Sequence, residues 1–306
     1  MQAPVGPVAT PALAAAVSEA GGIGSLGASW TEPAALRSQI REIRRMTERP
    51  FCVNLVLAFE PGERLEVAVA EGVELISFSW GVDAGMVARA HAAGCLVLAQ
   101  AGSAAEARAA VEAGCDAVVA QGIEAGGHVQ GGVGVLALVG ELSRSLRVPV
   151  LAAGGIADAR GVRAAMAAGA VGAMLGTRFL ATPEADVHPD WAARLLSAAA
   201  ADTVLTNVFD GGWAGAPHRV LRNSTYRLWE EAGRPPNGMR PGEGEILARH
   251  GDLDIERYSA DEPRRATTGD VEALCLYAGQ GVGLVTSVDP AGEVVSRIAA
   301  ELAAPG

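Results

Sequence analysis

The chain has 306 residues, half of them hydrophobic, and its 35 acidic and 24 basic side chains give a formal net charge of −11. This acidic balance disfavours nucleic acid or an anionic membrane surface as the main partner. The sequence has no apolar stretch of about 18 residues, as a membrane span needs, and no basic segment before an apolar N-terminal region, as a secretory signal needs. We therefore expect a cytoplasmic protein with no membrane span.

The chain alternates short apolar runs with helical segments over its first 180 residues. In chain order, the expected strands span 1–5, 23–26, 51–56, 74–78, 95–99, 117–120, 148–153 and 171–175. The expected helices span 11–20, 31–47, 62–71, 84–93, 104–113 and 159–168, and most of them end at a glycine. Repeated units of this kind predict a parallel sheet covered by helices, and eight strands close into a (β/α)8 TIM barrel. A doubly wound open sheet is the structural alternative.

The pattern changes after this predicted barrel core of residues 1–180. Residues 181–265 are richer in proline, tryptophan, arginine and acidic residues, and we expect a mostly helical cap on the substrate side of the barrel mouth. Residues 266–306 are expected to return to the barrel as helices. The first would begin at Thr268, with 272–280 as its body and end, and the second, at about 291–303, is amphipathic.

The cysteines show no sign of a disulfide framework or a metal site. Cys52, Cys95, Cys115 and Cys275 lie far apart, and no pair has the spacing of metal ligands. We expect inert core thiols in a reducing compartment and no bound metal.

Two turns that follow neighbouring strands predict a phosphate site. Gly154 and Gly155 follow the strand at 148–153, and Gly176 and Thr177 follow the strand at 171–175. With few side chains in the way, the backbone N–H groups of both turns can close on a phosphate. In a barrel with eight strands, the phosphate site commonly lies after the last two strands.

Polar residues at other strand ends are the candidates for chemistry. His128 lies at the tip of the loop 121–128, and histidine is the side chain best matched to proton transfer near neutral pH. Asn54 and Gln100 end two strands, where they would either contact a planar heteroaromatic ligand or satisfy loop backbone. Gln280 would lie over the site or simply end a helix. The other four histidines, His91, His188, His218 and His250, are expected to be structural or on the surface.

Seven segments, in order along nearly the whole chain, resemble the nitronate monooxygenase family, formerly called 2-nitropropane dioxygenases. They are Gln2-Ala-Pro, Ala20-Gly-Gly-Ile-Gly, Phe51-Cys-Val-Asn-Leu, Gln121-Gly-Ile-Glu-Ala-Gly-Gly-His, Ala152-Ala-Gly-Gly-Ile-Ala-Asp, Leu175-Gly-Thr-Arg-Phe and Ala278-Gly-Gln. The resemblance implies a barrel that binds FMN non-covalently.

The resemblance also implies roles for residues at matching positions. Gln2, Ala3, Pro4 and Val5 would touch the flavin ring, and Asn54, Gln100 and Gln121 would line the isoalloxazine and the ribityl chain. Gly126 and Gly127 would let their loop approach the flavin, and Gln280 would lie near it. Gly154, Gly155, Ile156, Gly176 and Thr177 would hold the phosphate, and His128 would be the catalytic base. The chain departs from the family in two ways: its first strand begins several residues late, and Val5 stands where methionine is common.

The expected reaction is therefore the oxidation of an alkyl nitronate or nitroalkane with dioxygen, which gives a carbonyl compound and nitrite. The partners would be this small molecule and dioxygen, in a monomer or homodimer. Two rivals share the fold: an FMN-dependent enoyl-acyl-carrier-protein reductase and an NAD(P)H:quinone reductase. The net charge of −11 disfavours docking of an acidic carrier, although Arg219, Arg222 and Arg227 would form a local basic patch. A flavin-binding protein without turnover is a further alternative.

Overall fold

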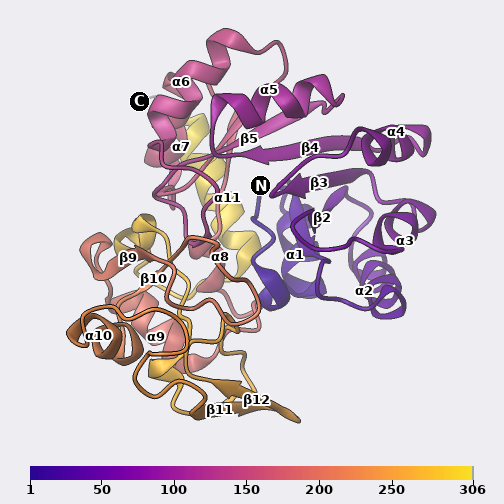
Figure 1. Cartoon of the computed structure of the whole chain (residues 1–306). Helices are drawn as coiled ribbons and strands as arrows, with labels where there is room; N and C mark the ends of the chain where they lie inside the picture. Colours follow the sequence, from indigo (N-terminus) through magenta and orange to yellow (C-terminus); the bar gives the residue numbers. More distant parts are fainter. Residues whose placement is uncertain (305–306) are drawn as a thin grey trace.

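The computed structural model of the chain describes residues 1–304, and a parallel sheet of seven strands organises them (Figure 1). In spatial order the strands are β1 (Gly24–Gly27), β2 (Phe51–Val56), β3 (Leu75–Ser79), β4 (Leu96–Ala101), β5 (Ala117–Gln121), β7 (Val150–Ala153) and β8 (Gly172–Met174). The spatial order follows the chain order, as in a barrel, whereas a doubly wound sheet reverses its order at a switch point. The sheet curls into a TIM-barrel-like fold, which confirms the predicted class.

Residues 1–3 join the two edges of the curled sheet. The N–H of Gln2 donates to Ile23 O just before β1, at 2.9 Å, and Gln2 forms a parallel bridge with Leu175, just after β8. On that side the Ala3 N–H donates to Leu175 O at 2.8 Å. The first predicted strand, 1–5, is thus reduced to a single bridged residue, which still supplies the eighth position of the barrel.

The helices that follow the strands cover the outside of the sheet. They are α1 (Pro11–Glu19), α2 (Pro33–Met46), α3 (Arg64–Ala70), α4 (Ala84–Ala92), α5 (Ala104–Glu112), α6 (Val135–Ser145) and α7 (Ala159–Ala167), with a 3-10 turn η1 (Gly6–Val8) before α1. The Thr10 hydroxyl accepts from Leu13 N at 3.1 Å, so α1 begins at the predicted cap and proline.

The barrel has an outer and an inner apolar layer. The outer core, between strands and helices, includes Leu36, Ile40, Phe51 and Phe78, all fully buried. The inner core takes one residue from each of six successive strands: Cys52, Leu75, Leu98, Val119, Ala153 and Met174. All four cysteines are buried and free, and burial raises the pKa of Cys52 to about 12, as expected for an inert thiol.

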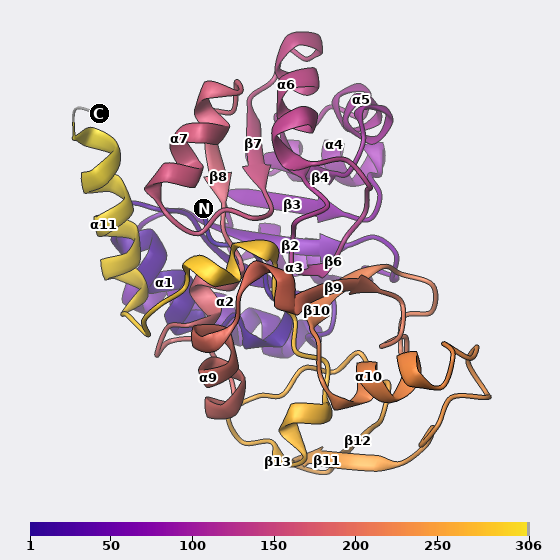
Figure 2. The same ribbon diagram turned by 90° about the vertical axis from the view of Figure 1, so that its left-hand side faces the viewer.

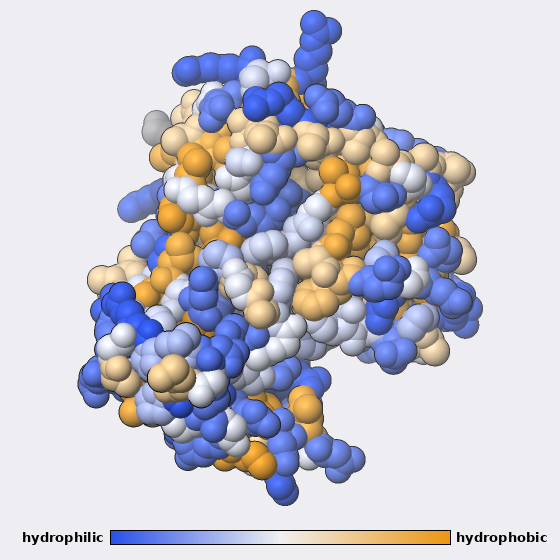
Figure 3. All heavy atoms as spheres, in the orientation of Figure 1, coloured by the Kyte–Doolittle hydropathy of each residue, from blue (hydrophilic) through white to orange (hydrophobic). Residues whose placement is uncertain are grey.

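The segment after β8 folds beneath the barrel as a cap (Figures 1 and 2). Its elements are α8 (Thr177–Leu180), α9 (Pro189–Ser197), η2 (Ala200–Asp202), β9 (Thr203–Thr206), β10 (His218–Leu221), α10 (Ser224–Glu231), β11 (Ile246–His250) and β12 (Leu253–Glu256). Alongside these helices the cap contains two antiparallel sheets. One is ordered β6-β10-β9, with β6 (Gly127–His128) from the barrel, and the other is ordered β12-β11-β13, with β13 (Thr268–Gly269) from the C-terminal region. Hydrophilic residues cover most of the face of the cap that Figure 3 shows.

The C-terminal region differs from the prediction in one element. No helix spans 272–280; this part holds β13 (Thr268–Gly269), η3 (Val271–Ala273), an extended stretch that pairs Tyr277 with Val220 of β10, and η4 (Gln280–Leu284). The predicted last helix is present as α11 (Ala291–Ala303), which packs beside α1 and α7 (Figure 2). Among residues 1–304, no helix has both the length and the apolarity that crossing a membrane requires.

Candidate active site at the barrel mouth

The two predicted turns lie side by side at the carboxyl ends of β7 and β8, which pair directly. Gly154 and Gly155 adopt φ values of +114° and +70°, a region that residues with side chains rarely enter. Within the described residues, the N–H groups of Gly155, Ile156, Gly176 and Thr177 donate to no protein acceptor. Four free donors on adjoining turns can bind a compact anion.

The C-terminal segment packs over these turns. Gly279 N donates to the Thr177 hydroxyl at 2.9 Å, and Gln280 N donates to Glu124 O at 2.9 Å. A Cβ on Gly126 would lie 2.4 Å from Gly279 N, so the backbones of the loop and the segment touch here. Gly126 thus lies against protein backbone, whereas a Cβ on Gly127 would have nothing within 4 Å.

Hydrogen bonds hold the loop that carries His128. Some are made by a residue of the loop itself and others by residues of the cap. Gln121 spans the loop: its Nε2 donates to His128 O at 2.9 Å and its Oε1 accepts from Gln130 N at 2.8 Å. Strand β6 pairs with β10, which sets His128 opposite His218. The buried Arg219 of β10 donates from Nη2 to Ile123 O at 2.8 Å. The cap strand β10 therefore holds the loop that carries His128.

His128 lies in an aromatic environment. Its ring stacks on Trp213 at a centroid distance of 4.1 Å and an interplanar angle of 29°, and the Trp80 ring lies 6.3 Å away, edge to face. Burial, and to a lesser degree His218, lowers the pKa of His128 to about 3, so its imidazole is neutral at physiological pH. The Nε2 atom of His128 is buried without a hydrogen-bond partner among the described residues.

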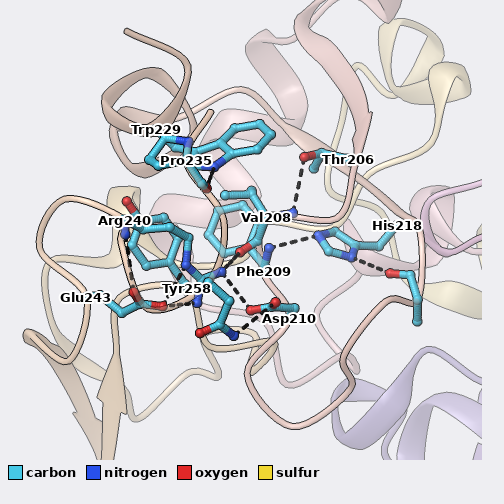
Figure 4. A network of polar contacts seen from close by, with 12 residues as sticks. Thr206, Val208, Phe209, Asp210, His218, Trp229, Pro235, Arg240, Glu243 and Tyr258 are labelled. Carbon is cyan, nitrogen blue, oxygen red and sulfur yellow. Dashed lines mark hydrogen bonds and ion pairs between the residues drawn. The ribbon is translucent and has the colours of Figure 1, made fainter. Parts of the chain in front are cut away.

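His218 supports this environment from the cap (Figure 4). Its Nδ1 donates to Ala216 O at 3.0 Å and its Nε2 accepts from Phe209 N at 3.2 Å, which assigns the neutral tautomer. Burial lowers its pKa to about 4. Both of its ring nitrogens are thus used to hold the chain on either side of Trp213, as in a structural histidine, although its ring lies only 5.5 Å from that of His128.

The buried Arg240 holds the segment that precedes Trp213. The Nη1 of Arg240 donates to Val208 O at 2.9 Å and to Asp210 Oδ1 at 2.7 Å, while its other nitrogens contact Glu243 (Figure 4). Its guanidinium lies over the Tyr258 ring, 4.3 Å from the centroid. Arg240, Asp210 and Tyr258 are among the residues that line a cavity of about 490 Å³, and no residue of its lining belongs to a strand of the barrel.

The remaining predicted contacts occupy the same mouth but are partly engaged within the protein. The Nδ2 of Asn54 donates to the Ser77 hydroxyl at 2.9 Å, and the Nε2 of Gln100 donates to Gln130 Oε1 at 2.8 Å. Each therefore keeps its own carbonyl oxygen for another partner. The fully buried Gln2 accepts from Ser25 N at 2.7 Å and also bonds to the Ala3 carbonyl.

Ala3 and Val5 lie next to the second turn. A Cβ on Gly176 would be 3.4 Å from Val5 Cγ1 and 3.6 Å from Ala3 Cβ. The exposed Gln280 joins the site through its backbone. The structure thus brings the predicted residues together at one end of the barrel.

Sequence reasoning missed Trp80, Trp213 and Gln130. The position of Trp80 directly after an apolar strand was the available signal, and its φ of +59° is unusual for a bulky residue. The expected patch of Arg219, Arg222 and Arg227 is wrong, because Arg219 is buried against the loop and only the other two are exposed. Within residues 1–304, no group of three or more His, Cys, Asp or Glu side chains could hold a metal ion.

Comparisons with known proteins agree on one family. The model of the nitronate monooxygenase family matches residues 1–62 and 57–301. A nitronate monooxygenase of Paraburkholderia phytofirmans is 32% identical, over 99% of this chain and 91% of that protein. A (3aS,4S,5R,7aS)-5-hydroxy-7a-methyl-1-oxo-octahydro-1H-indene-4-carboxyl-CoA dehydrogenase of Rhodococcus jostii is 35% identical, over 98% and 91%. The structure of FabK from Thermotoga maritima superimposes with a TM-score of 0.82 at 34% identity, covering 98% of this chain and 91% of that one.

Proposed function

Because this chain belongs to the nitronate monooxygenase family, whose members are oxidoreductases, we propose that it binds FMN and oxidises alkyl nitronates with dioxygen. The products would be a carbonyl compound and nitrite. The observation that carries the proposal is the buried Nε2 of the partly buried His128, which has no partner among the described residues, beside two turns whose N–H groups donate to no acceptor within residues 1–304.

The chain's residues fit the phosphate of FMN. The N–H groups of Gly155, Ile156, Gly176 and Thr177 have no protein acceptor within the described residues, and two of these four residues, Gly155 and Gly176, carry no Cβ. The Thr177 hydroxyl accepts from Gly279 N, so its own hydrogen remains to be donated. The free carbonyl oxygens of Asn54 and Gln100 would accept from the N–H edge of a flavin ring. A bound flavin would supply the electron transfer between the nitronate and dioxygen.

His128 would remove the α-proton of a neutral nitroalkane. A neutral imidazole has the lone pair that this step needs, and burial keeps the ring neutral down to about pH 3. Proton removal leaves a nitronate anion beside the imidazolium, and this opposite charge raises the pKa of His128 when the charge forms. When the nitronate itself is the substrate, the same group would donate a hydrogen bond to it.

Anaerobic stopped-flow absorbance of the flavin tests this proposal. The purified protein is mixed separately with ethylnitronate and with NADH or NADPH. We expect fast bleaching by ethylnitronate alone, followed by nitrite after air is readmitted. A protein that shows no flavin absorbance would refute both the cofactor and the reaction.

A His128→Ala variant separates catalysis from flavin binding. It should retain the flavin, because the phosphate turns are intact, and its rate with neutral nitroethane should fall by about 10²- to 10⁴-fold. Unchanged turnover with nitroethane would remove His128 from the mechanism.

The second candidate is a reductase or dehydrogenase that acts on an acyl thioester. The observation that favours it is the 35% identity to a carboxyl-CoA dehydrogenase over nearly the full length of both proteins. In the same stopped-flow experiment, bleaching by a nicotinamide but not by ethylnitronate would favour this candidate. An enoyl thioester and a quinone would then be tried as oxidants.

A further inference from the structure

The chain is poor in aromatic residues but concentrates them beside His128. Phenylalanine, tryptophan and tyrosine make up only 4% of its residues, with five tryptophans in all. Three of these, Trp30, Trp80 and Trp213, form one cluster with Phe59 and the His128 ring. The clustering therefore points to a function at this place.

Trp213 is the centre of this aromatic cluster. Its ring centroid lies 4.8 Å from that of Trp80, 4.8 Å from that of Phe59 and 6.4 Å from that of Trp30. These three residues follow β3, β2 and β1, at the carboxyl ends where barrel enzymes bind their substrates. Trp213 alone comes from the cap, so it joins the cap to the barrel mouth.

Trp213 is carried by a short glycine-rich flap, residues 211–215. Four of the five flap residues, 211, 212, 214 and 215, are exposed. The flap is anchored at its start, where Gly211 N donates to Tyr258 O and Ala260 N donates to Gly211 O, each at 3.1 Å. A Cβ on Gly212 or Gly215 would meet nothing within 4 Å, so the backbone around Trp213 has room to move.

The indole of Trp213 covers the face of His128 while the Nε2 of that ring has no partner within the described residues. A buried polar atom without a partner costs stability, and a hydrogen bond with a substrate atom can recover this cost. A flat substrate group that enters between His128 and the flap would stack on the His128 ring in place of the Trp213 indole. A short alkyl group would leave most of this aromatic surface unfilled.

We propose that Trp213 is a specificity-determining residue, which stacks on a flat conjugated group of the substrate so that aryl-substituted nitronates are preferred over short alkyl ones. This inference rests on the proposed function for the reacting nitro group. The expectation of a flat group in the ligand, however, follows from the aromatic cluster itself. Aromatic pairs contribute roughly 0.5–1.5 kcal/mol beyond the burial of their area, or about 2- to 12-fold in affinity.

Steady-state kinetics of the holoenzyme with two nitronates tests the proposal. We expect kcat/KM for the nitronate of phenylnitromethane to exceed that for ethylnitronate by about tenfold. Trp213→Leu should lower this ratio to near one, and Trp213→Phe, which keeps a ring to stack, should retain most of it. Trp229→Leu, at a partly buried tryptophan in α10 outside the cluster, is the matched control and should leave the ratio unchanged.

Two kinetic outcomes would overturn the proposal. One is a wild-type ratio near one. The other is an equal gain in kcat/KM for both nitronates in Trp213→Leu, because Trp213 would then only cover His128. If Trp213→Leu does not fold, the wild-type ratio decides: a ratio near tenfold that Trp213→Phe retains supports the proposal, and a ratio near one overturns it.

Binding of unreactive carboxylates tests the same inference without turnover. Phenylacetate and propionate have the shapes of the aryl and the short alkyl compound, with a carboxylate in place of the nitro group. Calorimetry should show that phenylacetate binds at least about fivefold more tightly, and that Trp213→Leu removes the difference. If no nitronate is oxidised but this difference is present, the proposed reaction fails and the flat-ligand site stands. Equal binding of both carboxylates would refute the site.

Discussion

At the scale of single residues, His128 combines two unfavourable features in one side chain. Its Nε2 is buried without a partner among the described residues, and its ring is kept neutral by burial. The first feature by itself costs stability, because an unpaired buried polar atom costs about 1–3 kcal/mol. A structural histidine, such as His218, has both ring nitrogens bonded to backbone. The contrast favours a role for His128 in binding or catalysis, where such costs are tolerated.

We predict that His128→Phe makes the protein less sensitive to acid. The folded-state pKa of about 3 lies below the ordinary value of 6.5, so the unfolded chain binds a proton below pH 6.5 that the folded chain does not. The stability present above pH 6.5 is therefore lost as the pH falls from 6.5 towards 3, by up to about 1.4 kcal/mol per pH unit. Phenylalanine keeps the stack on Trp213 and does not titrate.

Urea unfolding at pH 8, 6 and 5 measures this effect. The variant should be at least as stable as the wild type at pH 8 and should lose less free energy of unfolding at pH 5. Parallel losses in the two proteins would show that His128 is already accessible to protons in the folded state. The variant should also be inactive with neutral nitroalkanes, because the base is gone.

The sequence predicted only part of this residue-scale picture. Glycine turns and a loop-tip histidine could be recognised because each follows an apolar run, and the ends of barrel strands meet at one face. The contact of Trp213 with His128 could not be predicted, because it depends on how the cap folds back, and that of Trp80 depends on the path of the loop that carries His128. The partners that engage Gln2 and Gln121 could not be predicted for a different reason: the pattern marks a polar residue at a strand end, but not whether it faces a ligand or the backbone.

At the scale of elements, the segment 272–280 shows how tertiary contacts override a local pattern. Its residues permit a helix, but cap side chains take the carbonyl groups that a helix would use. Asn223 donates to Leu274 O at 2.6 Å and Thr225 donates to Ala273 O at 2.7 Å. With Leu221 N also bonded to Leu276 O, the segment lies extended beside β10. The barrel strands, by contrast, were predictable because their apolar runs end at turn glycines whatever the cap does.

We predict that Gly126→Ala disrupts the docking of the C-terminal segment on the loop that carries His128. The new Cβ would lie 2.4 Å from Gly279 N and 2.6 Å from the Ala278 carbonyl carbon, so one of the two backbones must move. Forced packing of this kind costs about 1–3 kcal/mol. The bond from Gln280 N to Glu124 O should weaken as well, which would loosen the phosphate turns that the segment covers.

Thermal unfolding and flavin retention check this prediction. Gly126→Ala should lower Tm by several degrees and release flavin more easily on dilution. Gly132→Ala is the control, because its Cβ would have no neighbour within 4 Å and its φ is not positive. Two variants with the same Tm and the same flavin affinity would show that the C-terminal segment can shift without cost.

At the scale of the whole molecule, one buried glutamine connects the two edges of the barrel. Gln2 bonds through its backbone to Ile23 O on the β1 side and bridges Leu175 on the β8 side. Its side chain adds a bond from Ser25 N at 2.7 Å inside β1. The proposed phosphate turns and the loop of His128 all follow strands of this barrel, so their spacing depends on its closure. Gln2 can therefore affect the site without touching a cofactor.

We predict that Gln2→Ala lowers the free energy of unfolding by about 1–3 kcal/mol, because it leaves the buried Ser25 N–H without its acceptor. Urea unfolding measures the loss, and Gln39→Ala, at a partly buried position of α2, is the control that should be close to neutral. Flavin affinity, measured on the folded variant by titration, should fall only slightly. A large loss of flavin affinity at unchanged stability would instead make Gln2 a direct flavin contact, as the family resemblance implies, and the barrel would then be closed by its backbone bonds alone.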